Sequence, residues 1–358
     1  MRYILLYGCL VFICMSCQSN SISKRAFEFT YSVNLEPSKG QKMELWIPIP
    51  QSNEVQIISN LNIDSQGLNY DLKEESDHGN KYLYVYAPNG IKTDKNVTVK
   101  FNVVRQEHQN VAYSNIEYSR YLKASSMVPV GDRFTEIIKD NNLNSDDMRG
   151  LYDFVLNGMH YGKPTDDNTS KNYKYIHGGK NPKTGQEWLP NNITYGLKKK
   201  TRDELVKSQK KNKKYAYGNG NSLYACDIGV GNCTDYHSYF ISLARTMDVP
   251  SRFHMGFPIP SGSEGLVGGY HCWADYYVEG EGWYPVDISE ADKDPVKTDY
   301  FFGTVNENRF EMNVGRDFIL EGYDGGPLNL FIYPIIEIND IKSDNYSKGF
   351  NYENKVWQ

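Results

Sequence analysis

Apolar and polar residues alternate strictly from residue 24 to about residue 107, which is the pattern of strands that bury one face. Turn signals separate the alternating runs, at residues 37–40 and 88–90. The alternating apolar residues are Phe27, Phe29, Tyr31, Val33 and Leu35; Met43, Leu45, Ile47 and Ile49; Tyr82, Tyr84 and Tyr86; Val97, Val99, Phe101 and Val103. The pattern predicts an antiparallel β-sandwich-like domain over residues 24–110. We interpret its tyrosine-rich faces as packing surfaces in preference to a carbohydrate-binding or protein-binding face.

The apolar period changes at Cys233, where a helical spacing of three and four residues begins. The residues on this stripe are Tyr236, Phe240, Leu243, Ala244 and Met247. Asn232 is a suitable N-cap, and Pro250 follows the end of the helix. Cys233 therefore lies in the first turn, where free backbone N–H groups and the helix dipole stabilise a thiolate. The same N–H groups are suited to bind a developing oxyanion.

Two strands, 251–259 and 270–278, follow this helix, and a turn at 280–282 leads into a returning strand that ends at Asp287. His271 begins the second strand. A thiol, an imidazole and a carboxylate in this chain order are the parts of a nucleophilic acyl-transfer site. Each has a structural alternative, since buried cysteine is common and a lone strand histidine is more often structural. The register that would bring His271 to Asp287 does not follow from the sequence.

Two sequence runs resemble the core of the bacterial transglutaminase-like superfamily, whose fold is a variant of the papain-like cysteine-protease fold. They are CTDYHSYFISLARTMDVPSRFHMGF, from Cys233, and HCWADYYVEGEGWYPVD, from His271. The resemblance covers roughly residues 215–335 and implies an α+β fold: a papain-like transglutaminase core, with the nucleophile helix packed on an antiparallel sheet, preceded by the all-β sandwich-like domain. It makes Cys233 the nucleophile, His271 the general base and acid, and Asp287 the orienting carboxylate. Asp248 stands where the family usually has glycine, which affects the helix end and not the chemistry.

The oxyanion hole and the pocket are less completely specified than the three catalytic candidates. The Cys233 backbone N–H is the natural first donor. Tyr224 is the nearest candidate for a second donor, with Asn219 and Asn221 as alternatives, and none of them fits a motif well. The candidate pocket residues are Trp273, His237 and Asp235.

Residues 1–17 have the composition of a secretory signal segment, with Arg2, an apolar run and then Ser16 before Cys17. The last four residues resemble a relaxed bacterial lipobox, which makes Cys17 the expected lipidated N-terminus and residues 18–23 a polar tether. We therefore expect a bacterial cell-envelope protein that contacts the membrane through its lipid anchor only. Simple secretion and an uncleaved anchor are the alternatives.

Three cysteines remain beyond the signal segment: Cys226, Cys233 and Cys272. In an oxidising compartment either Cys226 and Cys272 pair and leave Cys233 free, or all three are thiols. A zinc site from these cysteines and His237 is a weaker alternative, because the spacing matches no familiar zinc motif. We expect no metal and no cofactor.

The remaining segments complete the expected organisation. A helical stripe predicts a lead-in over residues 111–163; its apolar residues are Met148, Leu151, Tyr152, Val155, Leu156 and Met159. Residues 164–214 read as a lysine- and asparagine-rich insertion with a solvated surface, which could alternatively bind an acidic polymer or anionic headgroups, or close over the site through Trp188 and Tyr195. The catalytic core is expected over 215–340 and a polar, loosely ordered tail over 341–358.

Charge and address narrow the function. The 358-residue chain carries a net charge of −5, so nucleic acid is not an expected partner. We expect a cysteine-dependent amidase or peptidase acting on a peptide or protein substrate, with water as the acceptor. The alternatives are a protein-crosslinking transglutaminase that uses an amine acceptor, a catalytically silent glycan-binding or protein-binding module, and acyl transfer from a small-molecule donor.

Overall fold

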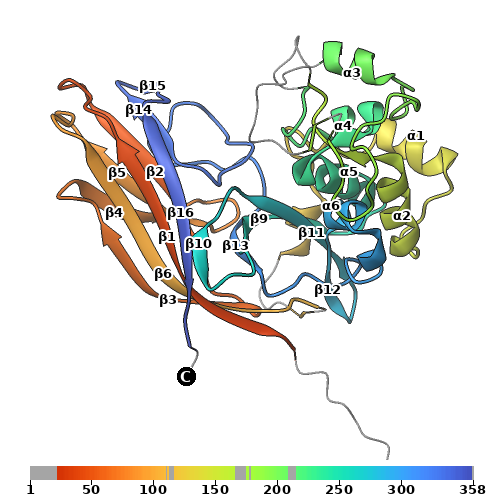
Figure 1. Ribbon diagram of the computed structural model, residues 1–358, viewed down its shortest axis with the longest axis horizontal. Coiled ribbons are helices and arrows are strands. Elements are labelled where there is room, and N and C mark those ends of the chain that lie inside the picture. The colour runs from red at the N-terminus through yellow and green to blue at the C-terminus, as the bar shows by residue number, and fades with distance from the viewer. Residues whose placement is uncertain are drawn as a thin grey trace, which may run out of the picture.

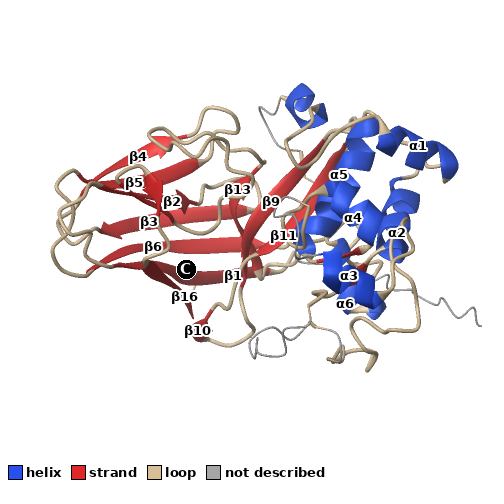
Figure 2. Ribbon diagram, turned by 90° about the horizontal axis from the view of Figure 1, so that it is seen from above, coloured by secondary structure: helices blue, strands red, loops and turns tan. Residues whose placement is uncertain are grey.

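The computed structural model describes residues 22–109, 111–112, 117–165, 175–176, 179–208 and 215–356. It consists of a β-sandwich and, beside it, a layer of helices packed on a smaller sheet (Figures 1 and 2). The fold class predicted from the sequence, α+β, is confirmed. The predicted signal segment and Cys17 lie outside the described residues.

Two five-stranded sheets form the sandwich. The first has the order β10 (Glu264–Leu266), β16 (Tyr346–Asn354), β1 (Lys24–Leu35), β6 (Lys95–Gln106), β3 (Gln56–Asp64). The second has the order β15 (Ile341–Lys342), β14 (Ile335–Ile338), β2 (Met43–Ile49), β5 (Lys81–Ala87), β4 (Asn69–Glu74). Alternate residues of β1 and β6 are buried because one face of each strand meets the core, as the sequence alternation predicts. Every residue of β2 is buried, because Trp46 on its outer face packs against Phe318 and Phe331.

The sequence predicted a polar, loosely ordered tail over residues 341–358, and this prediction is wrong where strands form in that segment. Strand β16 pairs along nearly the whole of β1, with Phe29 opposite Tyr352 and Tyr31 opposite Phe350. Phe350 and Tyr352 are buried while most of their neighbours along the strand are exposed. Because only two inward-facing residues of this strand are apolar, its sequence reads as polar although its backbone completes a sheet.

The smaller sheet has the order β12 (Gly282–Val286), β11 (His271–Val278), β9 (Ser251–Pro258), β13 (Arg309–Val314). Helix α5 (Cys233–Thr246) packs on β9 and β11 and also contacts four other helices. These are α1 (Arg133–Asp140), α2 (Met148–Gly158), α4 (Ser222–Ile228) and α6 (Ile288–Lys293). All residues of α5 from Cys233 to Arg245 are buried, where the sequence predicted one buried face. The helix is enclosed on every side, so its start and its contacts are firmly held.

Short elements complete the helical side of the molecule. They are η1 (Tyr118–Leu122), β7 (His160–Tyr161), α3 (Arg202–Ser208), β8 (Val230–Gly231), α6 (Ile288–Lys293) and η2 (Pro295–Lys297), with β7 and β8 paired in parallel. The described part of the expected insertion packs into the domain: Leu189, Tyr195 and Leu205 are buried against α4 residues, and Trp188 is also buried. The prediction that this segment has a solvated surface is therefore wrong for these four side chains.

One continuous core joins the sandwich to the smaller sheet. Phe29 of the sandwich lies with its ring centroid 4.7 Å from that of Phe310 on β13 and 5.2 Å from that of Phe257 on β9. Burial of such large aromatic side chains fixes the orientation of the sheet that carries the candidate site. No helix of the described residues is long and apolar enough to cross a membrane.

Candidate active site

The thiol of Cys233 lies at the first residue of α5, as predicted, and only 3% of the residue is exposed. Two reciprocal caps fix this helix start. The Asn232 side chain accepts a hydrogen bond from the Thr234 N–H at 2.9 Å, and the Asp235 carboxylate accepts one from the Asn232 N–H at 3.1 Å. Within the described part of the chain the Cys233 N–H has no hydrogen-bond acceptor, so it is available to an oxyanion.

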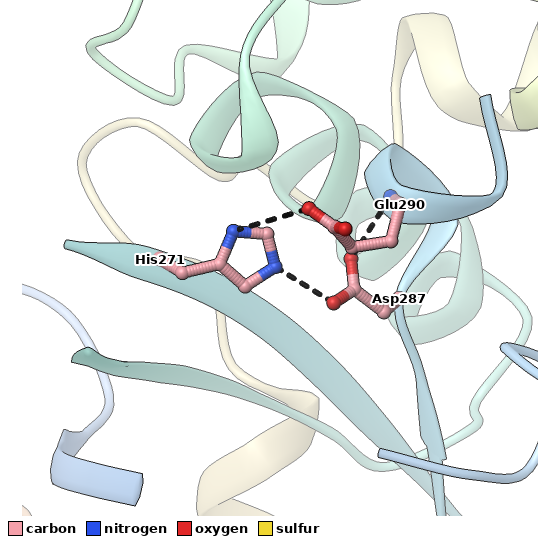
Figure 3. A group of neighbouring side chains, drawn as sticks. All are labelled: His271, Asp287 and Glu290. Atoms are coloured by element: carbon pink, nitrogen blue, oxygen red, sulfur yellow. Dashed lines mark hydrogen bonds and ion pairs between the residues drawn. The ribbon is translucent and has the colours of Figure 1, made fainter. Parts of the chain in front are cut away.

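The structure brings His271 and Asp287 together. His271 Nε2 lies 2.7 Å from Asp287 Oδ2 (Figure 3). Asp287 is the N-cap of α6, and its other oxygen accepts hydrogen bonds from the Glu290 N–H at 3.2 Å and the Ser289 hydroxyl at 3.1 Å. The capping role fixes the carboxylate, the carboxylate fixes the ring, and Nδ1 is the nitrogen that this pair leaves open.

Cys233 and His271 influence each other's proton affinity. A hydrogen bond from the Cys272 thiol, together with the nearby His271 and Lys293 charges, outweighs burial and holds the pKa of Cys233 well below its usual range. Burial opposes the charge on His271, but Asp287 and Cys233 outweigh it and raise its pKa to about 9. Against burial, His271 also lowers the pKa of Asp287. Both shifts favour a thiolate beside an imidazolium, which is the reactive form of a cysteine nucleophile.

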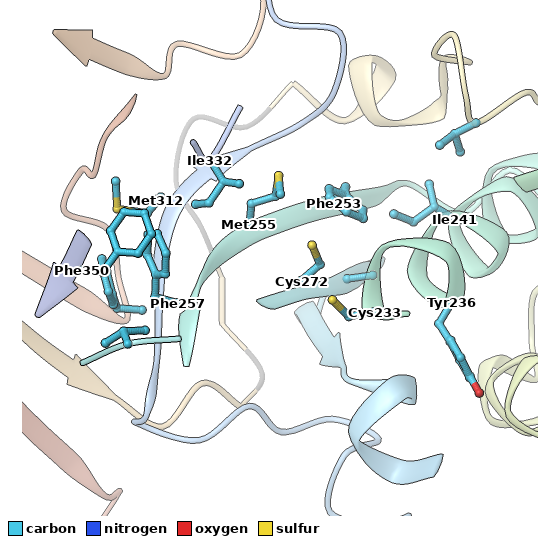
Figure 4. Packing of buried hydrophobic residues seen from close by; sticks show 14 of the residues in the cluster. Cys233, Tyr236, Ile241, Phe253, Met255, Phe257, Cys272, Met312, Ile332 and Phe350 are labelled. Carbon is cyan, nitrogen blue, oxygen red and sulfur yellow. The ribbon is translucent and has the colours of Figure 1, made fainter. Parts of the chain in front are cut away.

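Of the two alternatives for the cysteines, the structure has the second: Cys226, Cys233 and Cys272 are all free thiols, and the possible Cys226–Cys272 disulfide is absent. Cys272 lies beside Cys233 between β11 and α5 (Figure 4), and its sulfur is 3.6 Å from Thr234 Oγ1. Cys226 lies on α4, where its thiol donates to the Leu223 carbonyl at 3.3 Å. Among the described residues, no group of three or more metal-ligating side chains includes a cysteine, so the zinc alternative has no structural support.

His237 has a more specific place than the pocket wall proposed from the sequence. It is fully buried one turn after Cys233, and its Nδ1 lies 2.7 Å from the Cys233 carbonyl oxygen. Its Nε2 accepts a hydrogen bond from the Ile288 N–H at 3.1 Å. Burial lowers its pKa to about 4, so the ring is neutral and its Nδ1–H donates. His237 thus joins the residue that carries the thiol to the residue that follows Asp287.

Asp235 is fully buried at the helix start, where its contacts are those of a capping residue. Besides capping α5, it accepts hydrogen bonds from the Gly218 N–H at 2.8 Å and the Gly220 N–H at 3.0 Å, and burial raises its pKa to about 7. Arg316, which the sequence did not single out, holds the same loop: it donates to the Gly220 carbonyl at 3.1 Å and to the Ser238 hydroxyl at 2.7 Å. The two side chains fix the loop against α5.

The remaining sequence candidates have packing or capping contacts in the structure. Trp273 is fully buried and stacks on His254, with ring centroids 5.5 Å apart, so it is core and not pocket. Tyr224 belongs to a separate apolar cluster, with its ring 5.4 Å from that of Tyr215. The Asn221 side chain caps α4, and the Asn219 carbonyl accepts from Arg316. Asn219 belongs to the loop that Asp235 and Arg316 hold against the start of α5.

Sequence reasoning missed an ionic cluster on α6 and β13 that lies beside His271. Glu290 Oε1 lies 3.9 Å from His271 Nδ1 (Figure 3). Glu290 also pairs with Lys293 and, at 3.3 Å, with Arg309. His271, Asp287 and Glu290 could offer three ligand atoms within 4.8 Å of one another to a metal ion. Two cations already neutralise Glu290, so the cluster fits an internal ion-pair network better than a metal site. The E-x-x-K spacing on a helix was the one signal for it.

Comparison with known proteins agrees with this geometry. Residues 183–288 match the family model of the transglutaminase-like superfamily, and the match contains Cys233, His271 and Asp287. The chain carries a transglutaminase-like domain. The match begins at residue 183, so it includes part of the segment expected to be an insertion.

Two other similarities span more of the chain. An uncharacterized protein of Haemophilus influenzae is 25% identical over 377 residues, covering 91% of this chain and 90% of that protein. The crystal structure of a candidate cysteine protease from Cytophaga hutchinsonii aligns over 94% of both chains with a TM-score of 0.50 and 11% identity. At this identity the likeness concerns the fold alone. The periplasmic domain of TgpA from Pseudomonas aeruginosa, bound to ethylmercury, aligns at a TM-score of 0.35, which carries no argument.

Proposed function

We propose that this transglutaminase-like protein is a cysteine-dependent acyl-transfer enzyme that hydrolyses amide bonds in peptide or protein substrates. The observation that carries the proposal is the 2.7 Å contact between Asp287 Oδ2 and His271 Nε2. It leaves His271 Nδ1 to exchange a proton with the Cys233 thiol at the start of α5. The lowered pKa of Cys233 and the raised pKa of His271 support the same assignment.

The reaction runs in two halves. The Cys233 thiolate attacks the amide carbonyl carbon, and the oxygen becomes an oxyanion that accepts a hydrogen bond from the Cys233 N–H. The C–N bond then breaks as His271 Nδ1 gives its proton to the leaving amine, which leaves a thioester. In the second half, neutral His271 removes a proton from water as the water attacks the thioester. The C–S bond breaks, the carboxylic acid product is released, and the thiolate–imidazolium pair is restored.

Water is the proposed acceptor, because it is the default nucleophile unless a site excludes it. Cross-linking by an amine acceptor is the alternative within the same chemistry, since an amine can attack the same thioester. A silent binding module is the alternative outside it. The three outcomes are separated by the products, by the dependence on Cys233, and by whether an added amine is incorporated.

The test is peptide cleavage followed by mass spectrometry, on a mixed peptide library with and without monodansylcadaverine as an amine acceptor. Cys233→Ala should reduce turnover about 10⁴-fold or more, because the nucleophile is removed. Cys226→Ala, which removes a buried thiol on α4, is the matched control and should retain turnover. Dansylated products would show that an amine, and not water, is the acceptor, and the activity would then be that of a transglutaminase. Equal turnover by wild type and Cys233→Ala would overturn the proposal.

We also propose, from the sequence, that the enzyme acts in the bacterial cell envelope and is anchored by a lipid on Cys17. The measurement is metabolic labelling with a palmitate analogue in a bacterial host. Labelled wild type and unlabelled Cys17→Ser are the expected results. Equal labelling, or none in either protein, would contradict the anchor without affecting the proposed reaction.

A further inference from the structure

A cavity of about 280 Å³ lies beside the catalytic histidine. Glu290 forms part of its wall, and Glu290 Oε1 is 3.9 Å from His271 Nδ1. This nitrogen is the one that Asp287 leaves open, so it is the nitrogen that protonates the leaving amine in the proposed reaction. The cavity therefore lies on the Nδ1 side of His271, with Glu290 between the ring and the cavity.

Positive charge predominates in the cavity wall. The wall contains four cationic side chains and two carboxylates: Lys183, Lys293, Lys297 and Arg309 against Glu290 and Asp294. Lys293 and Arg309 pair with Glu290, and Lys183 lies 3.7 Å from Asp294. Lys297 is exposed and forms no ion pair with any described residue. An excess of two positive charges next to the reacting atoms favours an anionic ligand.

The hydrogen-bonding groups that remain open are donors. Arg309 Nε and Trp188 Nε1 are buried, and neither has a hydrogen-bond acceptor in the described part of the chain, although Arg309 Nε lies 4.0 Å from Asp287 Oδ2. Lysine, arginine and tryptophan side chains donate and do not accept, so their natural ligand is a group that only accepts. A carboxylate meets this condition, and it pairs well with guanidinium and ammonium groups. The aromatic rings of Trp188, Tyr175 and Phe301 supply apolar wall for the carbon atoms that carry it.

We propose that this cavity is a subsite for a carboxylate on the leaving side of the scissile amide. The proposal rests on the proposed function, and it names the substrate class: peptides whose leaving residue carries either a free C-terminal carboxylate or an acidic side chain. Lys297 and Arg309 bind the carboxylate, and the aromatic wall contacts the rest of the residue. The Glu290 ion pairs hold Lys293 and Arg309 in place.

The experiment uses alkylating probes in place of the unidentified substrate. The rate of Cys233 alkylation is measured by mass spectrometry with N-bromoacetyl-glycine, which carries a carboxylate, and with N-bromoacetyl-glycinamide, which is neutral. Their rate ratio is taken within each protein, so that any general change in thiol reactivity cancels. A third probe, the α-amide of N-bromoacetyl-aspartic acid, has its only carboxylate on the side chain.

We expect the carboxylate probes to react faster with the wild type than their ratio on free cysteine predicts. In Lys297→Gln this ratio should fall about threefold to fivefold, and it should also fall with added salt. Lys342→Gln, which removes an exposed lysine on β15, is the matched control and should leave the ratio unchanged. The glycine or the aspartate probe, whichever is preferred, identifies the position of the carboxylate.

The same ratio in wild type, Lys297→Gln and the double variant Lys183→Gln/Lys297→Gln would overturn the subsite. Failure of the proposed function looks different. It would appear as slow alkylation of wild-type Cys233 by the neutral glycinamide probe, at the rate of an ordinary buried thiol, whatever the ratio between the probes.

Discussion

Two histidine–carboxylate pairs are buried in the same four-stranded sheet, and only one of them faces a thiol. His254 on β9 lies 2.6 Å from Glu311 and 3.0 Å from Asp275, so carboxylates occupy both of its ring nitrogens. His271 on β11 gives Nε2 to Asp287 and keeps Nδ1 on the side of Cys233. A charged, buried histidine is therefore not by itself evidence of an active site. One ring nitrogen must remain for the reaction, beside a nucleophile at a helix start.

The surroundings of the two pairs differ in the same sense. Arg252 donates to Asp275 at 3.0 Å, and Trp273 stacks flat on His254, so the His254 pair is closed on all sides. Burial opposes its charge, but Asp275 and Glu311 outweigh burial and raise the pKa of His254. An ion-pair network of this kind serves packing and register. The His271 pair uses the same residue types to hold a reactive ring.

The largest difference should come from removing each histidine in turn. His271→Ala should reduce turnover about 10²–10⁴-fold, because the general acid and base is lost. His254→Ala should lower the free energy of unfolding by about 3–5 kcal/mol, since it leaves buried carboxylates short of partners. Turnover and urea unfolding are measured on both variants. A His254→Ala protein that folds stably but has lost activity would contradict a purely structural role for His254.

The two aspartates sharpen the same comparison. Asp287→Asn should lower the pKa of His271 from about 9, because the carboxylate that stabilises the imidazolium is removed. Imidazolium persists below the pKa and is lost above it, so the alkaline limb of the pH–rate profile should move to lower pH and turnover should fall about 100-fold or more. Asp275→Asn is the control and should affect stability without moving the limb. An unmoved limb in Asp287→Asn would remove Asp287 from the triad.

His237 should show its positioning role through pH. Its pKa is about 4 in the folded protein, below the ordinary value near 6.5, so the unfolded chain binds the extra proton between these values. Stability is therefore present above pH 6.5 and is lost as the pH falls toward 4, by roughly 3 kcal/mol. His237→Gln should lack this contribution and should alkylate Cys233 about tenfold more slowly. Thermal unfolding between pH 4 and pH 7 measures the first effect, and identical pH curves for both proteins would contradict it.

The smallest expected effect concerns the neighbouring thiol. The Cys272 hydrogen bond is the largest cause of the lowered pKa of Cys233, so Cys272→Ala should raise that pKa and slow alkylation several-fold at acidic pH. Cys272→Ser keeps a donor and should restore most of the rate. Cys226→Ala should change nothing, because burial raises the pKa of Cys226 to about 11 and it lies on α4. A slower rate in Cys272→Ser equal to that in Cys272→Ala would show that packing, and not the hydrogen bond, matters.

The elements predicted correctly from the sequence are those that local patterns of residues determine. Alternation predicted the strands β1, β2, β5 and β6, and the three-and-four spacing with the Asn232 cap predicted where α5 begins. The hairpin that carries His271 and leads to Asp287 was also predicted, with strand ends within one residue of those observed at β11 and β12. These features follow from neighbouring residues, so a single sequence contains them.

Features that depend on contacts between distant segments were missed. Strand β16 pairs with β1 across more than 300 residues of sequence, and its polar outer face hid it. The contact between Cys272 and Cys233 depends on how α5 lies on β11, and the sequence left open whether Cys272 pairs with Cys226 or is a free thiol. Arg309 and Arg316 reach the site from the chain beyond Asp287, and no local spacing connects them to it.

The most direct test of the central claim is the pH dependence of Cys233 alkylation by iodoacetamide, followed by mass spectrometry in the wild type and in His271→Ala. In the wild type we expect a Cys233 thiol pKa well below the ordinary value of about 8.5, and a change in the alkylation rate near pH 9 as His271 loses its proton. In His271→Ala the thiol pKa should be higher. An ordinary thiol pKa that is the same in both proteins would contradict it.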